Sequence, residues 1–176
     1  RITVSDLAAL QLLPAPPPTL VEALDLMRGR ALPYLDLRGS GQRMAELVRD
    51  ALRAGAPDGA LLGSGPGRSF APELALLPGL QATSGIGLPL LGRAISDQTL
   101  SAFTRRAIRG ARRNGATGLA VEYHLIRPPL LELCRREGFF VFAWTVDDPR
   151  VMSRLIALGV DGITTNRPDR LAALLP

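Results

Sequence analysis

The feature that most constrains the fold of this chain is a regular alternation of helices and short apolar strands from residue 19 onward. In each unit a helix runs to a glycine, an apolar strand follows, and a polar loop leads into the next helix. Glycine just past a helix end supplies the left-handed residue that the turn into a strand needs. Strands are predicted over 32–38, 59–64, 80–84, 118–123, 140–146 and 162–165, and helices over 19–29, 42–54, 71–77, 97–114, 128–137, 149–158 and 168–175.

Capping signals support several of these helix starts. Thr19 and Glu22 have the spacing of a capping box, in which each side chain bonds a backbone amide near the other residue. Asp148 before Pro149 places a capping carboxylate ahead of a proline at the first helical position. Asn166 is interpreted in the same way, as a helix cap rather than a ligand contact.

Six strands joined by helical crossovers must run parallel, which indicates an α/β barrel or an open doubly wound sheet. A complete eightfold barrel needs about 250 residues. Six units in 176 residues have the density of three-quarters of such a barrel. We therefore expect one domain over 1–176, with a proline-rich connector over 1–18 and repeating αβ units over 19–176.

Composition removes several kinds of chemistry. All 21 basic side chains are arginine, so no lysine nucleophile, Schiff base or phosphate-loop lysine is available. Cys134 is alone, which excludes an internal disulfide and a multi-cysteine metal site, and its apolar helical setting predicts a buried, inert thiol. The apolar runs are too short for a membrane span, and with no signal peptide in this chain we expect a cytoplasmic protein.

Candidate site residues lie near the carboxyl ends of predicted strands, where parallel α/β proteins bind ligands. Alternation places Asp36 and Arg38 on one face of their strand. The Asp36 carboxylate could bind a metal and the Arg38 guanidinium a phosphate. Alternatively, the two side chains form only an ion pair with each other. Trp144 is either barrel core or an apolar pocket wall. Glu122 and His124 fall on the same side of an extended chain and invite an acid–base role, although His124 could simply cap the next loop.

Two further features are interpreted as structural. The glycine-rich stretch 63–67 follows a strand but lacks the ending of a nucleotide phosphate loop, so a loop at the barrel mouth is favoured. An arginine stripe at helical spacing has no interleaved aromatic residues, which favours a solvated outer helix face over nucleic-acid binding. The stripe consists of Arg105, Arg106, Arg109, Arg112 and Arg113.

The chain resembles the glycerophosphodiester phosphodiesterase family over nearly its whole length. The resemblance is most specific in WTV at 144–146, GVDGI at 159–163, the closing segment 166–169, and PTLVEAL at 18–24. It implies an eightfold barrel that uses a divalent metal, held by carboxylates, and two histidines to release glycerol 3-phosphate and an alcohol. It also implies that Asp36 binds the metal, Mg or Ca, in place of a family glutamate, that Arg38 binds the phosphate and that Trp144 lines the substrate pocket.

The family's His-Arg-Gly, Glu-x-Asp and His-Asp motifs are absent from this sequence, and His124 matches neither catalytic position. We therefore expect a TIM-type (β/α)8 barrel lacking its first two βα units, with a small-molecule phosphodiester as substrate and no catalytic residue in this chain. Such a fragment should be inactive, or nearly so, alone. The alternative is a degenerate barrel that serves as a non-catalytic anion-binding or protein-interaction module. In either case an oligomer could cover the open sheet edges.

Overall fold

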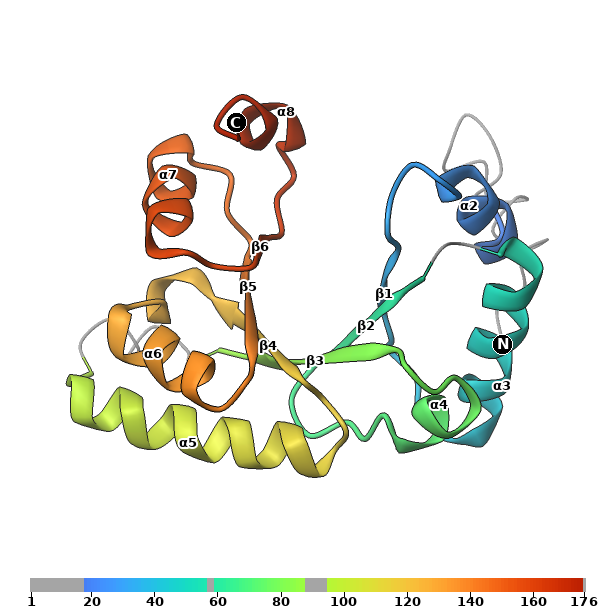
Figure 1. Cartoon of the computed structure of the whole chain (residues 1–176), viewed down its shortest axis with the longest axis horizontal. Coiled ribbons are helices and arrows are strands. Elements are labelled where there is room, and N and C mark those ends of the chain that lie inside the picture. Colours follow the sequence, from blue (N-terminus) through green and yellow to red (C-terminus); the bar gives the residue numbers. More distant parts are fainter. Residues whose placement is uncertain (1–17, 57–58, 88–94, 176) are drawn as a thin grey trace, which may run out of the picture.

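The computed structural model describes residues 18–56, 59–87 and 95–175, and shows a single sheet of six parallel strands (Figure 1). The strands are β1 (Tyr34–Asp36), β2 (Leu61–Ser64), β3 (Gln81–Ile86), β4 (Gly118–Glu122), β5 (Phe140–Trp144) and β6 (Gly162–Ile163). The helices are α2 (Leu20–Met27), α3 (Gln42–Gly55), α4 (Ala71–Leu76), α5 (Asp97–Arg113), α6 (Pro128–Arg136), α7 (Pro149–Leu158) and α8 (Pro168–Ala172), with a short 3-10 helix η2 (Tyr123–Leu125) after β4.

The strand order decides between the two predicted architectures. The strands are neighbours in chain order, from β1 to β6, and every pair is parallel. Right-handed crossovers that always move in one direction place all helices on one face of the sheet, whereas a doubly wound sheet reverses direction. Figure 1 shows the strands on the inside of an arc and the helices outside it. The predicted part-barrel is confirmed.

Contacts across the arc show how strongly the sheet curves. The ring centroids of Tyr34 on β1 and Phe142 on β5 lie 6.0 Å apart. In a flat sheet, four strand spacings of about 4.8 Å would separate these strands by about 19 Å. The inner faces of β1 and β5 therefore approach each other across the interior, as they do in a barrel.

The main hydrophobic core lies between the outer face of the sheet and the helices. Leu62, Leu119 and Val141 on the strands are almost completely buried, as are Ile108 on α5 and Leu155 on α7. Cys134 on α6 belongs to this core, and burial raises the pKa of its thiol to about 12, with a smaller contribution from Asp161. This agrees with the predicted inert thiol.

Glycines on the inner face make room for aromatic rings of the neighbouring strand. Gly118 pairs with Phe140 and Gly162 pairs with Phe142 in the strand register. A β-carbon at Gly118 would lie 2.4 Å from the Phe140 ring, and one at Gly162 would lie 2.9 Å from the Phe142 ring. The interior is thus filled by rings lying over glycines.

Helix ends follow the predicted chemistry with one exception. The Thr19–Glu22 capping box is present, and Asp148 accepts from the amide of Arg150. Left-handed glycines occur at 29, 79, 115, 138 and 159. At the end of α3, however, Gly55 is still helical, and Ala56 takes the left-handed conformation at φ 42°.

Close packing explains the exception. A β-carbon at Gly55 would lie 2.5 Å from Cβ of Leu24, so this glycine lets α2 approach α3. Arg28 also donates to the carbonyl of Gly55 at 3.0 Å, which fixes the same contact. The helix does end at Gly55, as the pattern predicts. The predicted reason was wrong, because Gly55 allows close helix packing and Ala56 supplies the left-handed turn.

Two other expectations concern the chain as a whole. Within the described ranges, no helix has the length and apolar character needed to cross a membrane. Most of the predicted connector, residues 1–17, lies outside the described residues, as does most of the segment between β3 and α5.

Two glycine-to-alanine substitutions in helices should have opposite effects. Gly55→Ala should lower the free energy of unfolding by about 1–3 kcal/mol, because the new methyl group forces α2 away from α3. Gly110→Ala should raise it by about 0.5–1 kcal/mol, because Gly110 lies within α5 with open space around its β-carbon position. Urea denaturation measures both. Equal effects of the two substitutions would contradict the packing at Gly55.

Candidate functional site

The carboxyl ends of the strands surround a cavity of about 560 Å3. This is the end of the sheet at which parallel barrels place their active sites. All three predicted site residues line the cavity, as do four residues that carry hydroxyl groups. It is lined by Tyr34, Asp36, Arg38, Ser64, Gly65, Pro66, Gly85, Ile86, Gly87, Ala120, Trp144, Thr145 and Thr164.

Asp36 and Arg38 lie on one wall of the cavity and form an ion pair, with Arg38 Nη2 2.5 Å from Asp36 Oδ2. The Arg38 side chain is 86% exposed and that of Asp36 is 46% exposed. Exposed ion pairs contribute only about 0–1 kcal/mol. The pairing therefore leaves the guanidinium free to exchange its partner for a ligand anion at little cost.

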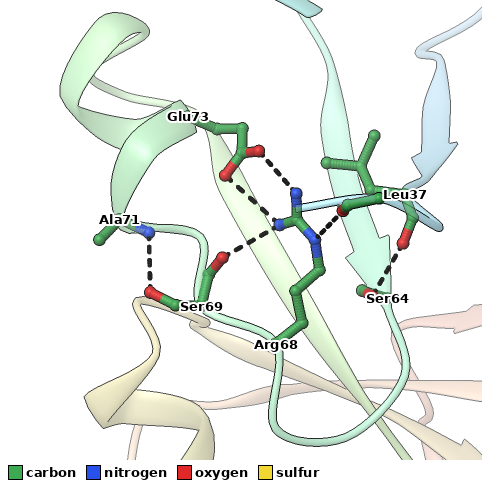
Figure 2. A network of polar contacts seen from close by, with 7 residues as sticks. Leu37, Ser64, Arg68, Ser69, Ala71 and Glu73 are labelled. Carbon is green, nitrogen blue, oxygen red and sulfur yellow. Dashed lines mark hydrogen bonds and ion pairs between the residues drawn. The ribbon is translucent and has the colours of Figure 1, made fainter. Parts of the chain in front are cut away.

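The backbone between these two side chains is held from both sides. Leu37 N donates to the carbonyl of Gly63 at 2.7 Å. Ser64 Oγ donates to the carbonyl of Leu37 at 2.9 Å (Figure 2). Leu37 itself is buried in the core. The prediction placed Asp36 and Arg38 on one face of the strand and Leu37 on the other. The structure agrees, because Asp36 and Arg38 are exposed and Leu37 is buried, although β1 is shorter than predicted.

A buried ion pair anchors the loops beside this wall. Arg68 donates to both carboxylate oxygens of Glu73, at 2.6 and 3.3 Å, and to the carbonyls of Gly39 and Ser69 (Figure 2). The Glu73 side chain is completely buried and that of Arg68 is 9% exposed. Because Gly39 directly follows Arg38, this pair ties the loop after β1 to the loop after β2.

Arg68 and Glu73 were not identified from the sequence. Nothing marked Arg68 among the other arginines, and Glu73 resembled an ordinary acidic residue in the first turn of a helix. Their spacing, with Arg68 in a glycine-rich loop and Glu73 just inside the next helix, was the only available signal.

The opposite wall consists of Trp144, Thr145 and Thr164. β5 ends at Trp144, which is partly exposed, while Val146 is 1% exposed and lies in the core. The amide of Val146 donates to the carbonyl of Thr164 at 2.9 Å, which joins the ends of β5 and β6.

Asp147 connects the loops that follow these two strands. Its carboxylate accepts from Asn166 Nδ2, the Asn166 amide and Thr165 Oγ1, at 2.8–3.0 Å. These bonds, those of Asn166 first, hold the pKa of Asp147 below its usual range, and Arg170 adds a smaller effect. The interpretation of Asn166 as a helix cap is wrong, because its side chain bonds Asp147 and the residue before α8 is Arg167.

Tyr34 forms part of the cavity floor. Its hydroxyl lies 2.7 Å from Thr83 Oγ1. Burial raises the pKa of Tyr34 and the charge of Asp36 adds to this, while the bond to Thr83 opposes it. The ring therefore reaches over β2, and its hydroxyl is held by Thr83 of β3.

Glu122 and His124 form a pair, with His124 Nδ1 3.3 Å from Glu122 Oε1. Neither residue is among those that line the cavity, and His124 lies in η2 beyond the end of β4. The arginine stripe is exposed on α5, on the outside of the arc, as predicted for a solvated face (Figure 1).

The described residues do not form a divalent-cation site by themselves. Ca and Mg prefer several oxygen ligands. Asp36 is the one carboxylate that lines the cavity, and it is paired with Arg38. Within ranges 18–56, 59–87 and 95–175, no group of three or more His, Cys, Asp or Glu residues is placed to hold a metal. Asp36 as a metal ligand stays a prediction.

The six parallel strands with helices outside them define this chain as part of a β/α-barrel, with a cavity of mixed charged and aromatic lining at its strand ends. Residues 92–170 match the model of the glycerophosphoryl diester phosphodiesterase family. Over this stretch, just under half of its length, the chain has the sequence pattern of the glycerophosphodiester phosphodiesterase family.

Two curated proteins with similar sequences are named glycerophosphodiester phosphodiesterases. The chain is 45% identical over 53 residues to a glycerophosphodiester phosphodiesterase of Caldanaerobacter subterraneus, over 30% of this chain and 22% of the relative. It is 39% identical over 64 residues to glycerophosphodiester phosphodiesterase GDPD4 of Arabidopsis thaliana, over 36% of this chain and 20% of the relative. The matches thus span about a fifth of the length of these curated relatives.

Solved structures support the fold. A glycerophosphodiester phosphodiesterase from Parabacteroides distasonis superimposes with a TM-score of 0.69 at 23% identity, over 98% of this chain and 70% of that one. This likeness concerns the fold alone, and it shows that the six strands correspond to part of a larger barrel.

Removing the buried guanidinium should be costly. Arg68→Met leaves Glu73 buried without its partner and should lower the free energy of unfolding by about 3–5 kcal/mol. Arg112→Met removes an exposed pair with Glu137 and should cost less than about 1 kcal/mol. Chemical denaturation of both variants measures the difference. Similar losses in the two variants would show that the Arg68 pair contributes no more than a surface pair.

The Asp147 network should weaken in acid. Because the pKa of Asp147 is lowered in the folded chain, its contribution is present above the ordinary pKa and is lost as the pH falls through the lowered value. The NMR signals of the Asn166 amide and side chain should therefore shift at a pH below that of an unperturbed aspartate. Asp147→Asn should abolish this transition, and a transition at the ordinary pKa would contradict the network.

Proposed function

We propose that this chain forms the phosphodiester-binding part of an enzyme that hydrolyses glycerophosphodiesters to glycerol 3-phosphate and an alcohol. The observation that supports this most directly is the shared cavity, with Arg38 on one wall and Trp144 on the other, in a chain of this family. The cavity volume of about 560 Å3 suits a small-molecule ligand.

In this proposal Arg38 binds the phosphate. A guanidinium presents paired N–H donors that match the oxygens of a phosphate group. Its present partner, Asp36, offers a similar pair of oxygens in an exposed setting, so a phosphate competes on nearly equal terms. During hydrolysis water adds to phosphorus, the P–O bond to the alcohol breaks, and the leaving oxygen takes up a proton. Arg38 would neutralise the non-bridging oxygens throughout.

Trp144 would form the apolar wall beside the substrate. Its ring is partly exposed at the end of β5, and Thr145 and Thr164 next to it carry hydroxyl groups into the same cavity. An aromatic wall with a few polar groups is typical of small-molecule sites.

The chain should bind this ligand without hydrolysing it at an appreciable rate. Hydrolysis needs general acid and base groups within hydrogen-bond reach of the reacting atoms. Among the described residues that line the cavity there is no histidine, and Asp36 is the one carboxylate. Further groups would have to come from outside these lining residues.

A non-catalytic, anion-binding barrel is the second candidate function, and the same observation favours it: the cavity pairs an arginine with few proton-transfer groups. The two candidates differ in one measurable respect. Both predict binding of a phosphate ester at Arg38, but only the enzyme predicts turnover in the longest natural reading frame that contains this chain.

Activity should depend on Asp36. In the full reading frame, Asp36→Ala should lower glycerophosphodiesterase activity at least about 100-fold, since it removes the predicted metal ligand. Chelation of divalent cations should have a similar effect, and Mg or Ca should restore activity only where Asp36 is intact. Asp50→Ala, which removes an exposed carboxylate on α3 paired with Arg49, should leave activity unchanged. Full activity of Asp36→Ala would overturn the proposed role, and absence of activity in the unaltered protein would favour the non-catalytic module.

A further inference from the structure

A second cavity, of about 520 Å3, lies between the sheet and α5. Ser84 places it on the outer face of β3, because Ser84 alternates with Thr83, whose hydroxyl meets that of Tyr34 on the inner face. We call it the outer cavity. Its walls include Ser84 and Ile86 on β3 and Phe103, Arg106, Gly110 and Arg113 on α5.

Two arginines line the outer cavity without an acidic partner. Arg106 and Arg113 are about two helical turns apart, so they lie on the same face of α5. Within the described ranges, neither guanidinium forms an ion pair or a hydrogen bond. Arg112, on the same helix, instead pairs with Glu137 and donates to its carbonyl. No carboxylate is among the described residues that line the cavity, so its positive charge is not neutralised locally.

The hydroxyl of Ser84 is a third polar group available to a ligand. Ser84 is 5% exposed, and its hydroxyl forms no hydrogen bond among residues 18–56, 59–87 and 95–175. Buried hydroxyl groups normally have a partner. In this part of the chain, every fully enclosed side-chain polar atom is hydrogen-bonded. The unbonded Ser84 hydroxyl therefore reaches the cavity that it lines.

The remaining wall of the outer cavity is mainly apolar. Phe103 and Ala107 lie one turn apart on α5, and Ile86 contributes from β3. A β-carbon at Gly110 would meet no atom within 4 Å, so there is open space at this point of the helix. Such a wall gains free energy by burial against a hydrocarbon chain, whereas a small hydrated anion would leave it unused.

From these observations we infer that the outer cavity binds an amphipathic anion, namely a carboxylate that carries an unbranched hydrocarbon chain. Arg106 and Arg113 bind the carboxylate, since guanidinium groups match the geometry of carboxylate oxygens. Phe103, Ala107 and Ile86 contact the chain. The volume suits a small molecule. This site is additional to the proposed phosphodiester site, because neither Arg38 nor Trp144 lines it.

NMR titration of this chain with octanoate, octanol and acetate separates the two parts of the ligand. Octanoate should bind about tenfold more tightly than octanol, which lacks the charge. It should bind at least about 100-fold more tightly than acetate, which lacks the chain. The amide signals of Ala107 and Gly110 should shift during the octanoate titration, because both residues line the outer cavity and neither lines the cavity at the strand ends.

Variants on α5 test the two roles. Arg106→Gln and Arg113→Gln should each weaken octanoate binding about three- to tenfold and leave octanol binding nearly unchanged. Arg105→Gln is the matched control, since Arg105 is exposed on the same helix and does not line the cavity, and it should bind octanoate like the unaltered chain. Gly110→Leu fills the open space and should weaken octanoate and octanol alike, with urea denaturation verifying that this variant is folded.

Four results would overturn the inference. They are no octanoate binding, octanol binding as tight as octanoate binding, undiminished binding in Gly110→Leu, and equal weakening by Arg105→Gln and Arg106→Gln. The last would assign octanoate to the general charge of the helix surface. Arg38→Gln separates the two cavities and should leave octanoate binding unchanged. A loss in that variant, with shifts at the Trp144 indole, would place the carboxylate at the strand ends and contradict the outer site.

Discussion

The direction of the crossovers determines how this molecule is built. Every helix returns the chain to the next strand in the same direction, so the sheet has a helix-covered outer face and an inner face that curls toward itself. The contact between Tyr34 and Phe142 results from this curl. The same curl brings Arg38, at the first strand, and Trp144, at the fifth, to one cavity although they are far apart in sequence.

Within that frame, polar contacts between consecutive loops fix the mouth of the part-barrel. The buried pair of Arg68 and Glu73 joins the loops after β1 and β2, and Asp147 joins the loops after β5 and β6. These two sets of contacts lie on either side of the cavity. Neither of them involves the side chain of Arg38 or Trp144, the residues proposed to face the ligand. The Arg38 side chain stays largely exposed at the cavity.

The repeating pattern of the sequence predicted the parallel sheet but left two strand orders open. The resemblance to the family favoured the barrel and pointed to Asp36, Arg38 and Trp144, which share the cavity. Two details could not be predicted from that pattern because they depend on contacts between distant segments. Gly55 is explained by the approach of Leu24, and Asn166 bonds the carboxylate of Asp147 instead of capping α8. Arg68 was missed because burial, which distinguishes it from the other arginines, is a property of the folded chain. The roles of Asp36, Arg38 and Trp144 stay predictions.

The central claim is that a phosphate ester binds between Arg38 and Trp144. A crystal structure of this chain with glycerol 3-phosphate tests it most directly. The account predicts that the Arg38 guanidinium leaves Asp36 and donates to the phosphate oxygens, with the ligand inside the cavity beside Trp144. A phosphate bound on the outer helices, with Arg38 still paired to Asp36, would contradict it.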